Sequence, residues 1–181
     1  MPTVPREPGP RLRADPVRTP FHIVLVEPEI PPNTGNIGRL CAATGCPLHL
    51  VGKLGFQIDE HAVRRAGLDY WHLVEVRQHA DLAQCEAALR CDEVRPSPRS
   101  WLLSGKSSRS FLDIEFQLGD ALIFGKESTG LDTAELSRRP ESVLGIPTLG
   151  QVRSLNLANS VSIVLFEALR QLGALNDASL R

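Results

Sequence analysis

The chain has 181 residues, of which 42% are apolar and 23% charged, and its net charge is -1. This length fits one domain, and no apolar run approaches the roughly 20 residues that a membrane span needs. The first twenty residues lack the basic start and apolar stretch of a signal peptide. We therefore expect a cytoplasmic protein with reduced thiols and no membrane partner. The near-neutral charge gives no global signal for nucleic acid, although a local basic patch remains compatible with it.

Residues 1–20 differ from the rest of the chain. They hold six of its 14 prolines, together with four arginines and two acidic residues. The apolar surface of this segment is too small to offset the conformational entropy that it would lose on folding. We therefore predict a flexible tail over 1–20 and a single folded domain over 21–181. The tail is interpreted as a dispensable extension, with contact to a polyanion as the less favoured alternative.

Strands and helices are expected to alternate from Phe21 onward. The prolines within 27–32 predict a stiff loop, after which Gly45 ends a helix that begins near Asn33. The alternation favours an α/β class with a mainly parallel sheet. Strands are expected at 21–26, 47–51, 73–76, 101–104, 121–124 and 143–146, and helices at 33–44, 59–65, 81–90, 133–137 and 159–172.

The last predicted helix is apolar in almost every direction. At about 100° per residue, Val161, Ile163, Val164, Leu165 and Phe166 point to most sides of it. A surface helix of a monomer normally keeps one polar face. Either this helix is central to its own domain or a second subunit covers its outer side, and the sequence alone does not separate the two.

Three loops that follow apolar strands are candidates for chemistry, because ligands of parallel sheets bind at the carboxyl ends of strands. The first, 33–39, places Arg39 on the outer face of a helix. There its guanidinium either binds a phosphate or is exposed to solvent without a ligand. The second, 125–131, contains Glu127 but has neither the P-loop nor the dinucleotide glycine spacing. The third, 146–160, contains Arg153, with Ser154 and Asn156 positioned as helix caps.

A metal centre is not predicted. None of the four cysteines forms a CxxC pair, and the histidines show no HExxH spacing. We therefore interpret the histidines as structural or exposed; they are His22, His49, His61, His72 and His79.

The three loops, in this order, resemble motifs of the SPOUT superfamily of S-adenosylmethionine-dependent RNA methyltransferases. Residues 27–39 resemble more narrowly the signature of the tRNA wobble-ribose 2′-O-methyltransferases of the TrmL type, and residues 64–70 match the same group. Residues 124–131 are similar to the second superfamily motif, and 146–147 with 153–157 to the third. The resemblance covers residues 21–173.

The resemblance implies an α/β fold with a C-terminal deep trefoil knot, and a homodimer formed through the knot and the last helix. It also implies transfer of a methyl group from S-adenosylmethionine to the ribose 2′-hydroxyl of the wobble nucleotide of tRNA, with S-adenosylhomocysteine as product and no metal. Many relatives carry tyrosine where this chain has Phe166. By the same resemblance, Arg39 is the catalytic residue; Leu103, Gly125, Ile146 and Ser154 contact the methyl donor; and Asn33, Glu127, Arg153 and Asn156 shape the pocket.

A guanidinium is effectively never deprotonated in proteins, so Arg39 is expected to orient the acceptor and stabilise negative charge rather than act as a base. The positive surface for RNA is expected at Lys53, Arg64, Arg65 and Arg153. Three other readings compete: methylation of another tRNA or rRNA nucleotide, a noncatalytic RNA-binding module of the same fold, and a nucleotide-dependent oxidoreductase. The missing glycine fingerprint argues against the last.

Overall fold

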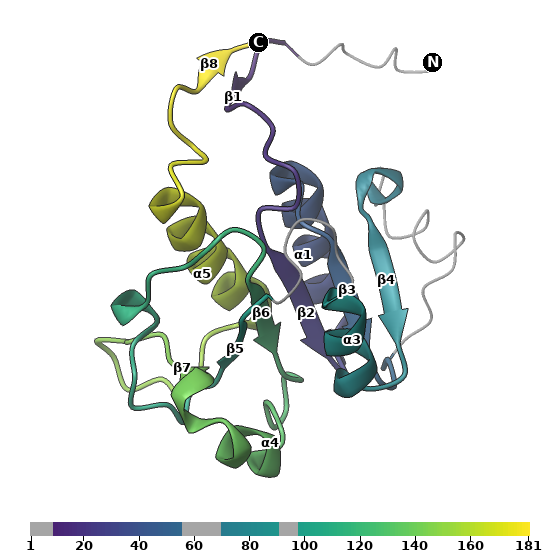
Figure 1. Ribbon diagram of the computed structural model, residues 1–181, viewed down its shortest axis with the longest axis vertical. Coiled ribbons are helices and arrows are strands. Elements are labelled where there is room, and N and C mark those ends of the chain that lie inside the picture. The colour runs from purple at the N-terminus through teal and green to yellow at the C-terminus, as the bar shows by residue number, and fades with distance from the viewer. Residues whose placement is uncertain (1–8, 56–69, 91–97) are drawn as a thin grey trace, which may run out of the picture.

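The computed structural model describes residues 9–55, 70–90 and 98–181, and shows a parallel sheet flanked by helices (Figure 1). The sheet strands are β2 (His22–Val26), β3 (Leu48–Val51), β4 (Val76–His79), β5 (Ser100–Leu103), β6 (Ala121–Phe124) and β7 (Val143–Leu144). Their order in the sheet is β4-β3-β2-β6-β5-β7, which confirms the predicted α/β class with a mainly parallel sheet. The deep knot stays a prediction. The α-helices are α1 (Pro31–Thr44), α3 (Leu82–Leu89), α4 (Thr133–Arg138) and α5 (Leu157–Gln171), with short 3-10 turns at η1 (Trp71–Leu73), η2 (Phe111–Asp113) and η3 (Pro140–Ser142).

The central strands are buried on both faces because helices cover both sides of the sheet. Side chains alternate along β2, so Ile23 and Leu25 join the core beneath α1 and α5, whereas Val24 joins the core beneath α3. Figure 1 shows α3 on the near side of the sheet and α1 on the far side. This arrangement explains why the strands are nearly continuous apolar runs in the sequence.

Helix α1 begins two residues before the predicted start. The prolines predict a loop over 27–32, but Pro31 and Pro32 are the first two residues of the helix. The first N–H groups of a helix have no partner within it, so proline is tolerated there and its fixed φ suits the helix. The prediction was right at the other end, where Gly45 caps the helix with a φ of 69°.

The strand predicted at 73–76 is wrong. Residues 71–73 form η1 with Leu73 65% exposed, and β4 begins at Val76 instead. Strand β4 lies at the edge of the sheet and carries polar residues, so the apolar pattern that identifies the central strands does not mark it. Strand β7 is also shorter than predicted, ending at Leu144, and the helix predicted at 59–65 lies outside the described residues.

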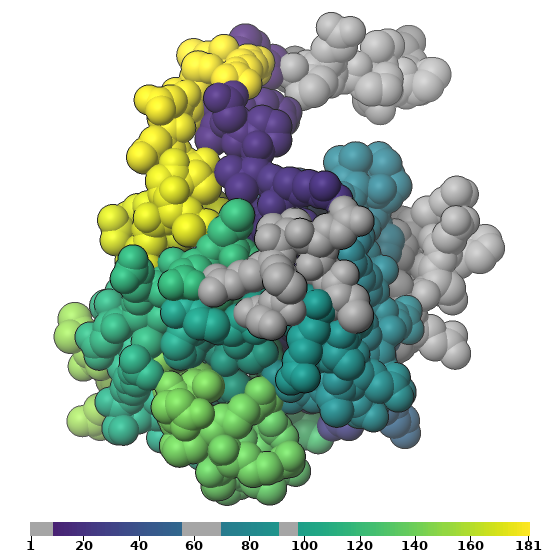
Figure 2. Space-filling view, viewed as in Figure 1, coloured from purple at the N-terminus to yellow at the C-terminus, as the bar shows by residue number. Residues whose placement is uncertain are grey.

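The two ends of the chain pair with each other. Strand β1 (Leu12–Arg13) is antiparallel to β8 (Ser179–Leu180), so part of the predicted tail has a partner, while residues 1–8 lie outside the described part. Figure 2 shows this pair projecting from the end of the molecule opposite α4. Within the described residues, no helix is long and apolar enough to cross a bilayer.

A fully buried carboxylate anchors the start of β6. Asp120 accepts hydrogen bonds from the Arg99 guanidinium, from Trp101 Nε1 at 3.0 Å and from the Gln117 N–H at 3.0 Å. Asp120→Ala leaves these donors unpaired and is expected to lower the free energy of unfolding by about 3 kcal/mol. Denaturant unfolding measures this. The control Asp15→Ala, at the exposed Asp15–Arg181 pair, should change it by less than about 0.5 kcal/mol; equal losses would contradict the prediction.

Candidate functional site

Three neighbouring strands end side by side at one edge of the sheet. Leu103 at the end of β5 pairs in register with Phe124 on β6 and with Leu144 on β7. Gly125 follows Phe124 directly, and Ile146 lies two residues beyond Leu144. The structure therefore brings together Leu103, Gly125 and Ile146, which the sequence places in three separate motifs.

Gly125 lies where the chain doubles back on itself. A Cβ added at this position would be 2.2 Å from the carbonyl carbon of Gly130 and 2.2 Å from the nitrogen of Leu131. The turn is closed by a 2.9 Å hydrogen bond from the Gly130 N–H to the Lys126 carbonyl. Only glycine fits, because every close atom belongs to backbone that cannot rotate away.

Gly125→Ala is expected to lower the free energy of unfolding by about 1–3 kcal/mol, since the backbone of 125–131 must move to admit the methyl group. Gly150→Ala is the matched control, because a Cβ there meets nothing within 4 Å. The control should stay within about 0.5 kcal/mol of the unmodified chain. Equal stability of the two variants in denaturant unfolding would contradict the close contact.

The carboxylate of Glu127 joins the second loop to the first. It accepts hydrogen bonds from the N–H of Glu29 at 2.8 Å, from the N–H of Ile30 at 3.3 Å and from Asn33 Nδ2 at 2.9 Å. Ile30 is the N-cap residue of α1 and provides no side-chain cap. Glu127 thus supplies from another loop the negative charge that a helix N-terminus favours.

Asn156 joins the third loop to the same network. Its Nδ2 donates to Asn33 Oδ1 at 3.0 Å, and its Oδ1 accepts from the N–H groups of Ala158 and Asn159 at the start of α5. The predicted cap is therefore confirmed for Asn156, which in addition reaches across to the first loop. Glu127, Asn33 and Asn156 form one continuous set of hydrogen bonds, which we call the three-loop network.

Two further pairs hold the residues just before the first loop, Glu27 and Glu29, to the second loop. Ser128 donates through its N–H and its hydroxyl to Glu29, both at 2.9 Å, and these bonds lower the pKa of the Glu29 carboxyl. Lys126 Nζ lies 2.7 Å from Glu27 Oε2, and this hydrogen bond raises the pKa of Lys126. Both groups are therefore held in their charged forms around neutral pH. Glu29 falls within the motif at 27–39, but the sequence does not predict its part in the site.

Arg39 lies on the exposed outer face of α1, as predicted. Its Cζ is 4.5 Å from the centre of the Tyr70 ring, and the Tyr70 hydroxyl donates to the Gly35 carbonyl at 2.7 Å. The backbone at the neighbouring Gly38 packs closely against Trp71, since a Cβ added at Gly38 would be 2.6 Å from the Trp71 ring. A stacked guanidinium keeps its edge free to donate, which suits an anionic or hydroxylic ligand. Tyr70 falls within the motif at 64–70, but the sequence does not predict this contact with Arg39.

The structure does not join every predicted residue to the network. Among the described residues, neither Arg39 nor Arg153 makes a hydrogen bond or ion pair with the three-loop network. Arg153 and Ser154 are exposed in the segment between β7 and α5, which passes close to the loop after β5: a Cβ at Gly105 would be 3.7 Å from the Arg153 carbonyl oxygen. Arg64 and Arg65 lie outside the described residues.

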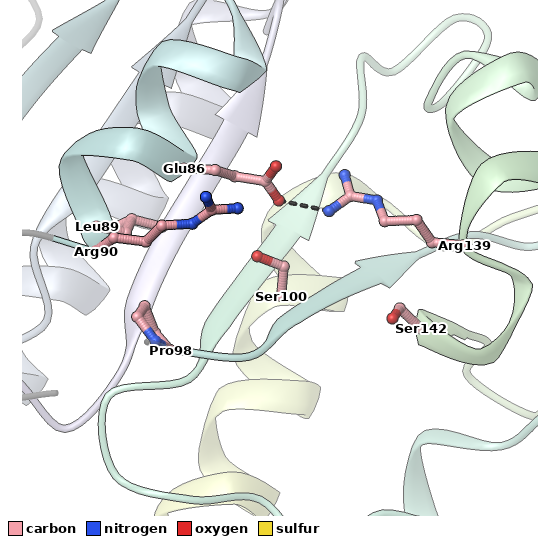
Figure 3. Close-up of a pocket in the computed structure, with 7 residues that line it drawn as sticks. All are labelled: Glu86, Leu89, Arg90, Pro98, Ser100, Arg139 and Ser142. Carbon is pink, nitrogen blue, oxygen red and sulfur yellow. Dashed lines mark hydrogen bonds and ion pairs between the residues drawn. The ribbon is translucent and has the colours of Figure 1, made fainter. Parts of the chain in front are cut away.

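A separate cavity of about 160 Å³ lies on the α3 side of the sheet (Figure 3). An ion pair from Glu86 on α3 to Arg139 after α4 crosses it, next to Ser100 at the start of β5. None of the predicted site residues lines this cavity. The three-loop network and the aligned strand ends are therefore the better candidate site.

Comparisons with known proteins agree with this geometry. Residues 20–166 match the model of the SpoU rRNA Methylase family. A "tRNA (cytidine(34)-2'-O)-methyltransferase" of Yersinia pestis is 44% identical over 154 residues, covering 84% of this chain and 94% of the relative. A solved structure described as "Structural insights into the 2-OH methylation of C/U34 on tRNA" is 43% identical, covers 84% of this chain and 95% of its own, and has a TM-score of 0.75.

A more distant structure carries a bound ligand. The AdoMet-bound rRNA methyltransferase from Sinorhizobium meliloti is 26% identical, with a TM-score of 0.70, and the match covers 88% of this chain and 62% of that one. The family suggested by the three motifs is thus confirmed over most of the sequence, by the family model and by a close relative. The chain belongs to the SpoU rRNA methylase family.

Proposed function

We propose that this protein transfers a methyl group from S-adenosylmethionine to the ribose 2′-hydroxyl of nucleotide 34 in the anticodon loop of tRNA. The observation that carries the proposal is the three-loop network, in which Glu127, Asn33 and Asn156 hold all three family motifs together at the strand ends. Relatives at 44–48% identity named for this reaction support the nucleotide and the position.

The residues at the strand ends suit the methyl donor. Leu103 and Ile146 offer apolar side chains and backbone polar groups, Gly125 a closely turned backbone, and Ser154 an exposed hydroxyl. These four residues are uncharged, so they do not repel a ligand that is itself a sulfonium cation. The bound donor would supply an electrophilic methyl group on a positively charged leaving group.

The chain's own contribution is to position the acceptor. The Arg39 guanidinium, stacked on Tyr70, orients the 2′-oxygen or its adjacent phosphate and stabilises the negative charge that develops as the hydroxyl loses its proton. Because guanidinium stays protonated, the proton passes to a phosphate oxygen or to water. The Glu127 carboxylate faces the start of α1, where it fixes the loop from which Arg39's helix begins.

A homodimer formed through α5 belongs to the same proposal. Helix α5 buries one face against α1 but leaves Ile163 41% and Phe166 48% exposed. These two side chains are three residues apart, so they lie on one outer face. A second copy of the chain covering this face would remove them from water, and the mass in solution measured by light scattering tests it.

The test uses tRNA that lacks 2′-O-methylation, incubated with the protein and labelled S-adenosylmethionine. Label that maps to the ribose of nucleotide 34 supports the proposal. Label at a different tRNA nucleotide, or on rRNA alone, would contradict nucleotide 34 as the acceptor. It would favour methylation of another tRNA or rRNA nucleotide instead. Measurable donor binding without any label in RNA would overturn it and favour a noncatalytic RNA-binding module.

A further inference from the structure

Three histidines lie in a row on one face of the sheet, and none of them belongs to the three-loop network. His22 on β2, His49 on β3 and His79 on β4 share the face covered by α3, because His49 alternates with the opposite-facing Leu48 and Leu50. His22 Nδ1 is 3.1 Å from His49 Nε2, and His49 Nδ1 is 3.0 Å from His79 Nε2. The row ends beneath α3, the helix that carries Cys85.

The donor atoms of His49, His79 and Cys85 lie within 4.8 Å of one another. Tetrahedral zinc, with bonds near 2.0 Å to nitrogen and 2.3 Å to sulfur, would separate its ligands by about 3.3–3.6 Å. His49 Nδ1 and His79 Nε2, which are 3.0 Å apart, would open by about 0.3 Å, and a pair at the 4.8 Å limit would close by about 1.2–1.5 Å. His49 and Cys85 are fully buried, while His79 is partly exposed and leaves a route for an ion. The three residues come from three different elements, β3, β4 and α3.

We propose that His49, His79 and Cys85 form a binding site for a zinc ion, separate from the methyl-transfer site. Two nitrogens and one thiolate are a ligand set that zinc prefers, and a water molecule completes the tetrahedron. On binding, the Cys85 thiol releases its proton to solvent and the thiolate bonds the metal. The proposal stands apart from the methyltransferase activity, because none of these residues belongs to the three-loop network.

The remaining contacts of His49 fit this arrangement. When His49 binds the metal through Nδ1, its Nε2 carries the hydrogen and donates to His22 Nδ1, so that His22 fixes the ring and its tautomer. Burial, with the nearby charges of His22, His79 and Arg77, lowers the pKa of His49 to about 3, so its ring is neutral and can bind a metal. Burial and the charge of Glu86 raise the pKa of Cys85 to about 12, so the thiol stays protonated until a metal displaces the proton.

Charged groups around the cluster affect the ion in opposite directions. Arg77 lowers the pKa of both His49 and His79, and its positive charge opposes a cation. The carboxylate of Glu75 accepts a hydrogen bond from Arg77 Nε at 2.8 Å and offsets part of that charge. Glu86, which raises the pKa of Cys85, adds an attractive charge that its ion pair with Arg139 partly offsets. The bound ion would connect the edge strand β4 to β3 and α3, where β4 is only half-buried.

Titration of the chelator-treated full chain with Co²⁺ tests the site, because tetrahedral cobalt with a thiolate ligand gives visible bands and a thiolate charge-transfer band. We expect one Co²⁺ per chain and displacement of these bands by Zn²⁺. Cys85→Ser should abolish the charge-transfer band, and His79→Gln should weaken binding at least about 10-fold. Cys46→Ser is the control, since Cys46 is also buried but lies in the core on the other face of the sheet; it should bind as the unmodified chain does.

If the buried substitution Cys85→Ser prevents folding, cobalt binding by the unmodified chain still tests the proposal. Failure to bind cobalt near one equivalent per chain overturns the proposal, as does a charge-transfer band that survives in folded Cys85→Ser. His79→Gln changes a partly exposed ring, so it is expected to fold, and unchanged affinity in this variant would equally overturn it. Zn²⁺ should also raise the melting temperature of the unmodified chain and of Cys46→Ser, but not of His79→Gln.

Discussion

Glu127→Gln is expected to lower the turnover of methyl transfer about 100-fold, the loss typical of reacting groups displaced by about 1 Å. The glutamate accepts three hydrogen bonds from Glu29, Ile30 and Asn33, whereas a glutamine would turn an NH₂ group towards these donors. The same change removes negative charge from the N-terminus of α1. We therefore also expect the free energy of unfolding to fall by about 1–3 kcal/mol.

The control for this variant is Glu141→Gln, on the exposed turn η3 away from the three-loop network. It should keep normal turnover and stability. Single-turnover rates at saturating tRNA and donor, together with denaturant unfolding, separate the two effects. Turnover within about twofold of normal for Glu127→Gln would show that the network does not position the reacting groups.

Arg39→Lys is expected to reduce turnover by a factor of about 100–1,000, similar to the loss of one preorganised donor at a site of developing charge. Lysine keeps the positive charge but loses the planar fork and the stacking on Tyr70. Binding of S-adenosylmethionine, measured by calorimetry, should remain within about twofold, because Arg39 is not among the proposed donor contacts.

Arg138→Lys is the matched control for Arg39, since Arg138 is an exposed arginine on α4. It should leave both turnover and donor binding unchanged. Near-normal turnover of Arg39→Lys would contradict the positioning role. Loss of donor binding in Arg39→Lys would instead place the residue in the donor site.

The sequence predicted the sheet well because its central strands are buried on both faces. The ranges 121–124 and 133–137 correspond closely to β6 and α4. The edge strand β4 was misplaced, since a half-buried strand has no continuous apolar run. The paired ends β1 and β8 were missed because they are joined mainly by backbone hydrogen bonds between residues far apart in the chain.

The candidate site was predicted residue by residue but not as a network. Asn33, Glu127 and Asn156 were each named, but their contacts span 94 and 123 residues, and no local pattern specifies which amide meets which carboxylate. The histidine row shows the same difficulty. Spacing rules detect metal ligands that are neighbours in one segment, whereas His49 and His79 meet only because β3 and β4 pair.

The most direct measurement is methyl incorporation into two tRNAs that differ by a single oxygen. In one of them, only the ribose of nucleotide 34 lacks its 2′-hydroxyl. The proposed reaction predicts that label from S-adenosylmethionine enters the complete tRNA and falls to background in the deoxy-substituted one. Equal incorporation into both tRNAs would contradict the proposed acceptor, because the methyl group would then be reaching another atom.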